Sequence, residues 1–352
     1  MQVNRYEDLI GMLTLHPIMD GRGVLLIPED TIIGPQHIEK LENFKIDPYD
    51  IHVQPAAAAA PETAPAAAAL GGPADERELV RKTESRLYDL EKLALSDGKV
   101  PVSDLESQVL PLIMEAARKR NLFQLFADLK SASDYRYKQT IGVVFMSAAL
   151  GKWLRLDDKE LSLLTTAASL YDIGSAKLPS YLLNKPGAFH PSEWEIMKEH
   201  TVLGHEILKE SGVDSRVALV ALQHHEREDG SGYPHRLKSE DIDPLSKIVA
   251  LADVYVAMTS ERPYRPAYTF YEVVKEIHES IIRGRFDSRI GMTFLNGLMN
   301  AQIGSEVLLS DGRSGKILLI NPNYPASPLI SVGDEFLDLC KSDAVRIQEI
   351  VG

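Results

Sequence analysis

The chain is poor in the residues that would crosslink it or anchor it in a membrane. Cys340 is the only cysteine among 352 residues, which excludes an intramolecular disulfide and a thiolate metal cluster. A metal site would therefore need histidine and carboxylate ligands. The sequence has no run of about 18 apolar residues, and its first residues lack the basic and apolar segments of a secretion signal. We expect a cytoplasmic protein that makes no membrane contact.

Acidic residues also outnumber basic residues, 51 to 38. The formal net charge is −13 at pH 7, while hydrophobic residues make up 44% of the chain and charged residues 25%. This composition is typical of a globular chain with a real core, and the negative field disfavours nucleic acid as a partner. A ligand that carries phosphate would need a local basic pocket.

The order of residue patterns predicts a mainly α protein in five segments. Residues 1–53 combine short apolar runs with one helix, which indicates a small α/β module, and the Pro- and Ala-rich residues 54–75 indicate a linker. Apolar residues at three-to-four spacing predict amphipathic helices within 76–130 and an all-α domain at 131–300. Runs of β-branched residues and leucine between turn signals predict a small β unit at 301–352.

Histidines gather in one part of the central segment. Five of the ten, at positions 190, 200, 205, 224 and 225, fall within 36 positions. His224 and His225 are adjacent, and neighbouring side chains on a helix point about 100° apart, so both can bind metal only at a broad site or where a helix ends. A polar surface pair or a capped core pair is the alternative. We interpret His190 and His205 as structural.

The segment that begins with this pair carries a more specific pattern. From His224 to Pro234 the sequence HHEREDGSGYP fits HHExxDGxGYP at every fixed position. It resembles the signature of the HD-GYP phosphodiesterases, a branch of the metal-dependent HD phosphohydrolases that open cyclic di-GMP. Other segments match in order as far as Arg265, and the resemblance covers a little under half of the chain. It implies an HD-type helical fold for 131–300.

The resemblance also implies a metal site. In this family a bridging aspartate and several histidines hold two or three iron or manganese ions, which activate the water that attacks phosphorus. On this chain the bridging carboxylate corresponds to Asp172, and the imidazoles of one metal position correspond to His200, His224 and His225. The distal carboxylate of the other position corresponds to Asp253.

The second metal position departs from the family pattern. Gln139 stands where the motif YRHS has its histidine, and Tyr171 and Ser175 replace the first histidine and the lysine of HDIGK. An amide oxygen is a weak ligand, and a phenol must first lose a proton with a pKa near about 10. Gln139 and Tyr171 are therefore weak metal candidates, and one ion is favoured over two. Lys177 lies two residues past the lost lysine, about 200° around a helix, which disfavours simple replacement.

The residues expected to contact the nucleotide match the family pattern better than the second metal position does. Arg262 and Arg265 match basic positions of the family, and guanidinium groups suit phosphate oxygens. A surface pair of arginines is the alternative. The segment that we call the GYP loop contains Asp229, Gly230, Gly232, Tyr233 and Pro234. Tyr233 is a candidate catalytic or ligand contact, and its other interpretation is a residue that packs the loop.

Together these patterns favour a degenerate HD-GYP protein with a regulatory signalling role. We expect it to bind metal and cyclic di-GMP or a related nucleotide, with weak or no phosphodiesterase activity. The alternative is an active metal-dependent phosphodiesterase that hydrolyses cyclic di-GMP to pGpG or GMP, and a metal-stabilised scaffold is a third possibility. Protein partners at the GYP loop or at the flanking modules, and a homodimer, are compatible with these readings.

Overall fold

The structure is a computed structural model that describes most of the chain. The described residues are 6–16, 18–19, 25–27, 31, 33–34, 37–38, 41–42, 44–48, 51–55, 82–83, 85–90, 92–94, 96, 98–112, 135–183, 185, 187–260, 267–342 and 344–351. The chain divides into two compact units, residues 1–69 and 70–352. Helices dominate, and a β-sheet follows them near the end of the chain, so the predicted mainly α fold class is confirmed.

The first unit contains short strands around a small apolar core. Its elements are η1 (Tyr6–Leu9), β1 (Met12–Thr14), β2 (Ile18–Met19), β3 (Leu25–Ile27) and β4 (Val53–Pro55). Strand β1 pairs with β4, and β2 pairs with β3, both antiparallel. Leu9, Ile27 and Leu41 are completely buried between them. Strand β4 extends into the first residues of the predicted linker, and residues 56–75 of that linker lie outside the described residues.

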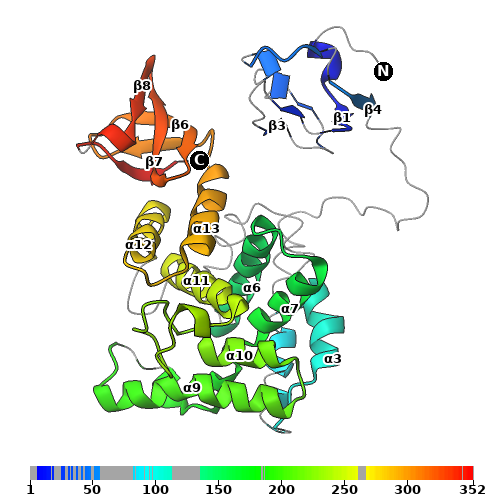
Figure 1. Cartoon of the computed structure of the whole chain (residues 1–352), viewed down its shortest axis with the longest axis vertical. Helices are drawn as coiled ribbons and strands as arrows, with labels where there is room; N and C mark the ends of the chain where they lie inside the picture. Colours follow the sequence, from blue (N-terminus) through cyan, green and yellow to red (C-terminus); the bar gives the residue numbers. More distant parts are fainter. Residues whose placement is uncertain are drawn as a thin grey trace. The chain divides into compact units, whose positions relative to one another are not determined.

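Helices form most of the second unit (Figure 1). Those with described bounds are α3 (Val102–Asp104), η4 (Leu105–Val109), α6 (Tyr135–Trp153), α7 (Asp158–Leu170), η5 (Ile173–Lys177), α8 (Ser180–Leu183), α9 (Pro191–Glu210), α10 (Ser215–Gln223), η6 (Ser239–Asp241), α11 (Pro244–Thr259), α12 (Phe270–Ile282) and α13 (Ser288–Asn300). Residues 82–83, 85–90, 92–94 and 96 are also helical. Side chains of Asp157, Asp214, Asp243, Thr269 and Asp287 cap the starts of α7, α10, α11, α12 and α13. Each cap accepts a hydrogen bond from a backbone N–H that the helix itself leaves unpaired.

An antiparallel sheet closes the second unit. Its strands are β5 (Glu306–Leu309), β6 (Ser314–Asn321), β7 (Tyr324–Val332), β8 (Glu335–Asp338) and β9 (Ile347–Ile350), in the order β8-β7-β6-β5-β9, with the short η7 (Leu339–Lys341) after β8. Val307, Ile317 and Ile330 point inward and join the same apolar cluster as the helices. Helices α12 and α13 lie against this sheet (Figure 1). The predicted β unit therefore shares its core with the helical region.

A close approach of backbones sets the geometry next to the histidines. The turn η5 crosses α9 at Gly174 and Gly204, both of which lack a side chain. A Cβ atom on Gly174 would lie 2.0 Å from the His200 carbonyl oxygen and 2.4 Å from the Gly204 nitrogen. Only glycine fits there. Because Asp172 lies two residues before Gly174, this contact brings its carboxylate beside His200.

Among the described helices, none combines the length and the apolar character that crossing a lipid bilayer requires.

We expect Gly174→Ala to unfold the protein more easily and to weaken metal binding. The added methyl group forces η5 away from α9, and overpacking of this kind costs about 3 kcal/mol. Urea unfolding of the purified chain measures the change. Gly151→Ala in α6 is the matched control, because its Cβ would meet the flexible ends of Leu161 and Leu164 first, at 2.9 and 3.0 Å. Equal stability of the two variants would contradict the role given to Gly174.

Candidate metal centre

Three imidazoles converge in the second unit. His200 lies in the middle of α9, His224 is the residue at which α10 ends, and His225 follows it. Each offers one ring nitrogen, and these atoms lie within 4.8 Å of one another. His224 and His225 reach the same point because the helix ends between Gln223 and His224, which is one of the two arrangements that the sequence allows. His200 and His224 are buried, and His225 is partly buried.

Backbone carbonyls fix how two of these rings are oriented. His200 Nδ1 lies 2.6 Å from the Met197 carbonyl oxygen, and His224 Nδ1 lies 2.9 Å from that of Ala221. A carbonyl only accepts, so each Nδ1 carries the proton and donates it, and in the neutral ring the Nε2 lone pair is free for a metal. The two Nε2 atoms face each other at 3.3 Å.

The charge state of the cluster also suits a cation. Burial lowers the pKa of His224 well below its ordinary value, and the neighbouring His200 lowers it further. Burial likewise lowers the pKa of His225, with His224 and His200 adding to the effect. Lone pairs that meet between two Nε2 atoms repel each other, and a bound metal ion would remove this repulsion. The residues present therefore fit one ion.

Asp172 adds a carboxylate to the cluster. Its Oδ1 lies 3.7 Å from His200 Nε2, and 32% of its side chain remains exposed. Desolvation nevertheless raises the pKa of Asp172 to about 6, and the negative charge of Asp253 adds to this rise. His200 opposes the rise most strongly, followed by Arg136 and a hydrogen bond with Ser175. An imidazole and carboxylate set of this kind suits iron or manganese.

Hydrogen bonds from neighbouring side chains hold the Asp253 carboxylate. Its Oδ1 accepts one hydrogen bond from Gln139 Nε2 at 2.9 Å and another from the Tyr171 hydroxyl at 2.8 Å. Gln139 Nε2 also donates to the Asp253 backbone carbonyl at 3.1 Å. Both acceptors lack a hydrogen, so the amide nitrogen of Gln139, and not its oxygen, must face them.

At Asp253 Oδ1 this arrangement does not suit a second ion. Gln139 and Tyr171 are buried, and both direct hydrogens at the carboxylate oxygen that a metal would need. A cation there would meet donor hydrogens instead of lone pairs. Val256, one turn further along α11, is also buried in the apolar core and offers no ligand.

The GYP loop is held by a buried carboxylate. Glu226 is 2% exposed, and it accepts hydrogen bonds from the backbone N–H groups of His235 at 2.7 Å and Leu237 at 3.0 Å. Gly232 passes so close that a Cβ atom on it would lie 2.4 Å from the Glu226 Cα. The sequence analysis gave Glu226 no role, and its position directly after two histidines was the available signal.

A partly buried arginine supports the end of α10. Arg227 Nη1 donates to the backbone carbonyls of Glu226 at 2.7 Å and His224 at 3.2 Å, and its guanidinium lies 5.1 Å from the centre of the Phe286 ring. Carbonyls at a helix end have no partner within the helix. Arg227 therefore steadies the segment that presents His224 and His225, a role that the motif spacing did not reveal.

The predicted loop residues occupy distinct places. Asp229 is exposed, and its carboxylate accepts from the Ser231 N–H at 2.9 Å, so it shapes the turn around Gly230, which has a φ of 77°. The peptide bond between Tyr233 and Pro234 is cis. The Tyr233 ring stacks on His225 at 4.6 Å, and burial raises the pKa of its phenol, so the hydroxyl stays a donor.

A groove runs between α9 and the GYP loop. Its volume is about 620 Å³, which is within the range of small-molecule sites. Phe189 stacks on Trp194, and Trp194 meets Tyr233 edge-on at 5.7 Å, so aromatic rings lead from the surface towards His225. The groove is lined by Trp194, Glu195, Lys198, Glu199, Val202, Gly230, Ser231, Gly232, Tyr233, Pro234 and Arg236.

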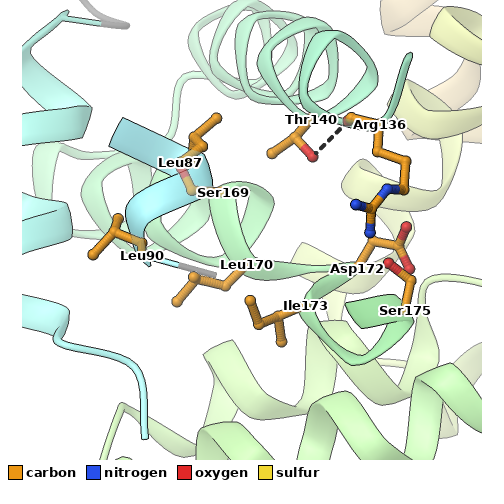
Figure 2. A pocket seen from close by; sticks show the side chains of 9 residues that line it. All are labelled: Leu87, Leu90, Arg136, Thr140, Ser169, Leu170, Asp172, Ile173 and Ser175. Carbon is orange, nitrogen blue, oxygen red and sulfur yellow. Dashed lines mark hydrogen bonds between the residues drawn. The ribbon is translucent and has the colours of Figure 1, made fainter. Parts of the chain in front are cut away.

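A smaller pocket lies beside Asp172. Figure 2 shows Arg136, from the start of α6, directing its guanidinium at the Asp172 carboxylate, with Ser175 on the opposite side. Arg136 was not predicted from the sequence. The available signal was its spacing, because a residue three positions before Gln139 lies on the same helix face. Lys177 is exposed, and Arg262 and Arg265 lie outside the described residues.

Comparisons with known proteins agree with the sequence resemblance. The family described as HD domain matches residues 110–290. A cyclic di-GMP phosphodiesterase of Pseudomonas aeruginosa is 31% identical over 65% of this chain and 55% of its own length. A cyclic di-GMP phosphodiesterase of Thermotoga maritima is 37% identical over 49% of each chain. A response regulator of Xanthomonas campestris named as a cyclic di-GMP phosphodiesterase is 35% identical over 55% of this chain and 52% of its own.

The chain spans about half the length of these curated relatives. Among solved structures, an HDG"Y"P protein from Bdellovibrio bacteriovorus covers 84% of this chain and 97% of its own, with 17% identity and a TM-score of 0.45.

Metal affinity should rise with pH up to about 6. Asp172 must lose its proton to bind a cation, and its pKa in the metal-free protein is about 6, whereas the pKa values of His224 and His225 lie well below the ordinary value. Below pH 6 we expect the affinity for Mn²⁺ to fall about tenfold per pH unit. Calorimetric titrations between pH 5 and 8 measure this, and Asp172→Asn should remove the carboxylate step. Identical pH profiles for the two proteins would argue against Asp172 as a ligand.

Proposed function

The chain belongs to the HD domain family, in its HD-GYP branch, and on that premise we propose that it is a one-metal nucleotide-binding protein with weak or no phosphodiesterase activity. The family is metal-dependent, and iron or manganese is the proposed ion. His200, His224, His225 and Asp172 would hold it. When bound, such an ion polarises a phosphoryl oxygen and lowers the pKa of water.

The hydrogen bonds to Asp253 carry this proposal. Two-ion hydrolysis places cations on both the attacking and the leaving side of the phosphodiester. Gln139 and Tyr171 direct N–H and O–H groups at the carboxylate of the second position, so its ligand set is replaced by donors. Loss of one ion should cost several kcal/mol of transition-state stabilisation, and each 1.36 kcal/mol is a factor of about ten in rate.

Cyclic di-GMP or a related cyclic dinucleotide is the proposed ligand. Several relatives are named for that substrate. The groove between α9 and the GYP loop is large enough for part of such a molecule, and its exposed Trp194 offers a face on which a purine can stack. Lys198 and Arg236 also line the groove, but Glu195 and Glu199 balance their charge, and Glu195 pairs with Lys198 at 2.7 Å. The support for a nucleotide therefore rests on the size of the groove and on the Trp194 ring.

An active phosphodiesterase is the second candidate. The cluster of three imidazoles beside Asp172 favours it, since these residues would hold an ion that could supply Lewis-acid activation for slow hydrolysis of a phosphodiester. The two candidates share the ligand and differ in turnover. A regulatory role in signalling, with the GYP loop or the flanking modules as protein contacts, follows from the first candidate and not from the second.

Binding and turnover of the same nucleotides separate these candidates. Manganese-loaded protein should bind cyclic di-GMP and release no pGpG or GMP above the rate of an Asp172→Ala control, because the second cation is missing. Calorimetry measures binding, and chromatography of the nucleotides measures turnover. Hydrolysis at many turnovers per minute that Asp172→Ala abolishes would support the active enzyme, and a lack of nucleotide binding would overturn the proposal.

Restoring two histidines should restore the second position. In the double variant Gln139→His and Tyr171→His, two imidazoles replace the donors at Asp253, and we expect one additional manganese ion per chain by elemental analysis. Turnover of cyclic di-GMP should rise about tenfold or more if the new ion takes up transition-state charge. Tyr171→Phe is the control, because it removes a hydrogen bond to Asp253 and adds no ligand. An unchanged ion count in the double variant would count against this explanation.

A further inference from the structure

We propose that Arg136 is a phosphate-positioning residue, which supplies from α6 the positive charge that the family's lysine supplies from the turn after the bridging aspartate. The inference rests on the proposed function and deepens it, because it assigns a phosphate contact to a residue outside the family motif. Its chemistry concerns one phosphate group of the nucleotide, next to Asp172.

The position of Arg136 carries the inference. It lines the pocket beside Asp172 together with Ser175, which occupies the sequence position of the lost lysine (Figure 2). Ser175 is buried, and its short side chain hydrogen-bonds Asp172. A serine reaches less far than a lysine, and Figure 2 shows the guanidinium of Arg136, which comes from another element, beside the Asp172 carboxylate in this pocket.

The pocket is matched in size to part of a phosphate group. Its volume is about 40 Å³, which is space for about three water molecules and far too little for a nucleoside. Leu87 and Leu90 form one wall of it. A ligand can therefore place phosphate oxygens in the pocket only if its sugar and base remain outside.

Within this pocket the guanidinium is the strongest donor that the described residues provide. The Thr140 hydroxyl donates to the Arg136 carbonyl at 3.1 Å, and the Ser169 hydroxyl donates to the Thr165 carbonyl at 2.8 Å, so the protons of both hydroxyls are already engaged. A guanidinium has five N–H groups in a planar fork. This number of N–H groups allows Arg136 to serve a phosphate in addition to the partners that it already has.

Lys177 provides a matched comparison. It is the other cation near the lost lysine in sequence, but it is exposed at the far end of η5 and does not line the pocket. If only the overall positive charge near the site mattered, the two residues would contribute alike. If a directed donor beside Asp172 matters, only Arg136 should contribute.

Calorimetry on the full-length, manganese-loaded chain tests this, with cyclic di-GMP, inorganic phosphate and guanosine as separate ligands. We expect Arg136→Gln to weaken binding of cyclic di-GMP and of phosphate about tenfold or more, and to leave guanosine binding unchanged. Arg136→Lys should recover part of the loss, and Lys177→Gln should bind all three ligands as the parent does. Manganese content and the unfolding midpoint verify that each variant is folded and loaded.

The outcomes separate this inference from the proposed function. If the parent binds cyclic di-GMP and Arg136→Gln binds it equally well, the role of Arg136 is wrong and the proposed function stands. If the parent binds phosphate in an Arg136-dependent way but does not bind cyclic di-GMP, the proposed ligand is wrong and Arg136 stands. Four other outcomes would each overturn the role of Arg136. The first two are a variant that changes only manganese affinity, and a Lys177→Gln variant that loses as much affinity as Arg136→Gln. The others are a parallel loss of guanosine binding and a parent that binds neither cyclic di-GMP nor phosphate.

Discussion

The carboxylate of Asp253 accepts hydrogen bonds from two side chains that the family pattern reserves for metal ligands, and the proposed function depends on this interaction. Gln139 and Tyr171 both reach Oδ1, at 2.9 and 2.8 Å, from different helical segments. A partly buried carboxylate is stabilised either by a cation or by hydrogen-bond donors. Here donors supply that stabilisation, so the fold around Asp253 does not depend on an ion there.

The histidine cluster is assembled by separate structural contacts. The contact of Gly174 with α9 sets Asp172 beside His200, and the end of α10 turns His224 and His225 towards the same point. Backbone carbonyls orient two of the rings so that their Nε2 atoms converge. The histidine cluster and Asp253 therefore meet near Asp172, whose pKa of about 6 reflects burial, His200 and Asp253 at once. In the proposed function, an ion on one side and hydrogen bonds on the other would satisfy the charges of this region.

Local sequence patterns were enough to predict the fold class and the family resemblance. Contacts between residues far apart in the chain could not be predicted in this way. The three-to-four spacing of apolar residues gave the helices, and HHEREDGSGYP gave the family. The partners of Asp253 lie 114 and 82 residues away from it, so the sequence could show the loss of two ligands but not that the new side chains donate to the carboxylate. Arg136 was missed because it belongs to no family motif. Glu226 and Arg227 were missed because they form hydrogen bonds with backbone groups, which a sequence motif does not reveal. The shared core of the helices and the sheet depends on long-range packing, which periodicity does not reveal.

The most direct test of the central claim is anomalous diffraction from crystals of the manganese-loaded protein, recorded at the manganese edge. We expect one anomalous peak, bounded by the ring nitrogens of His200, His224 and His225 and by the carboxylate of Asp172, with Gln139 and Tyr171 still directed at Asp253. A second peak of comparable height in contact with the Asp253 carboxylate would contradict the account.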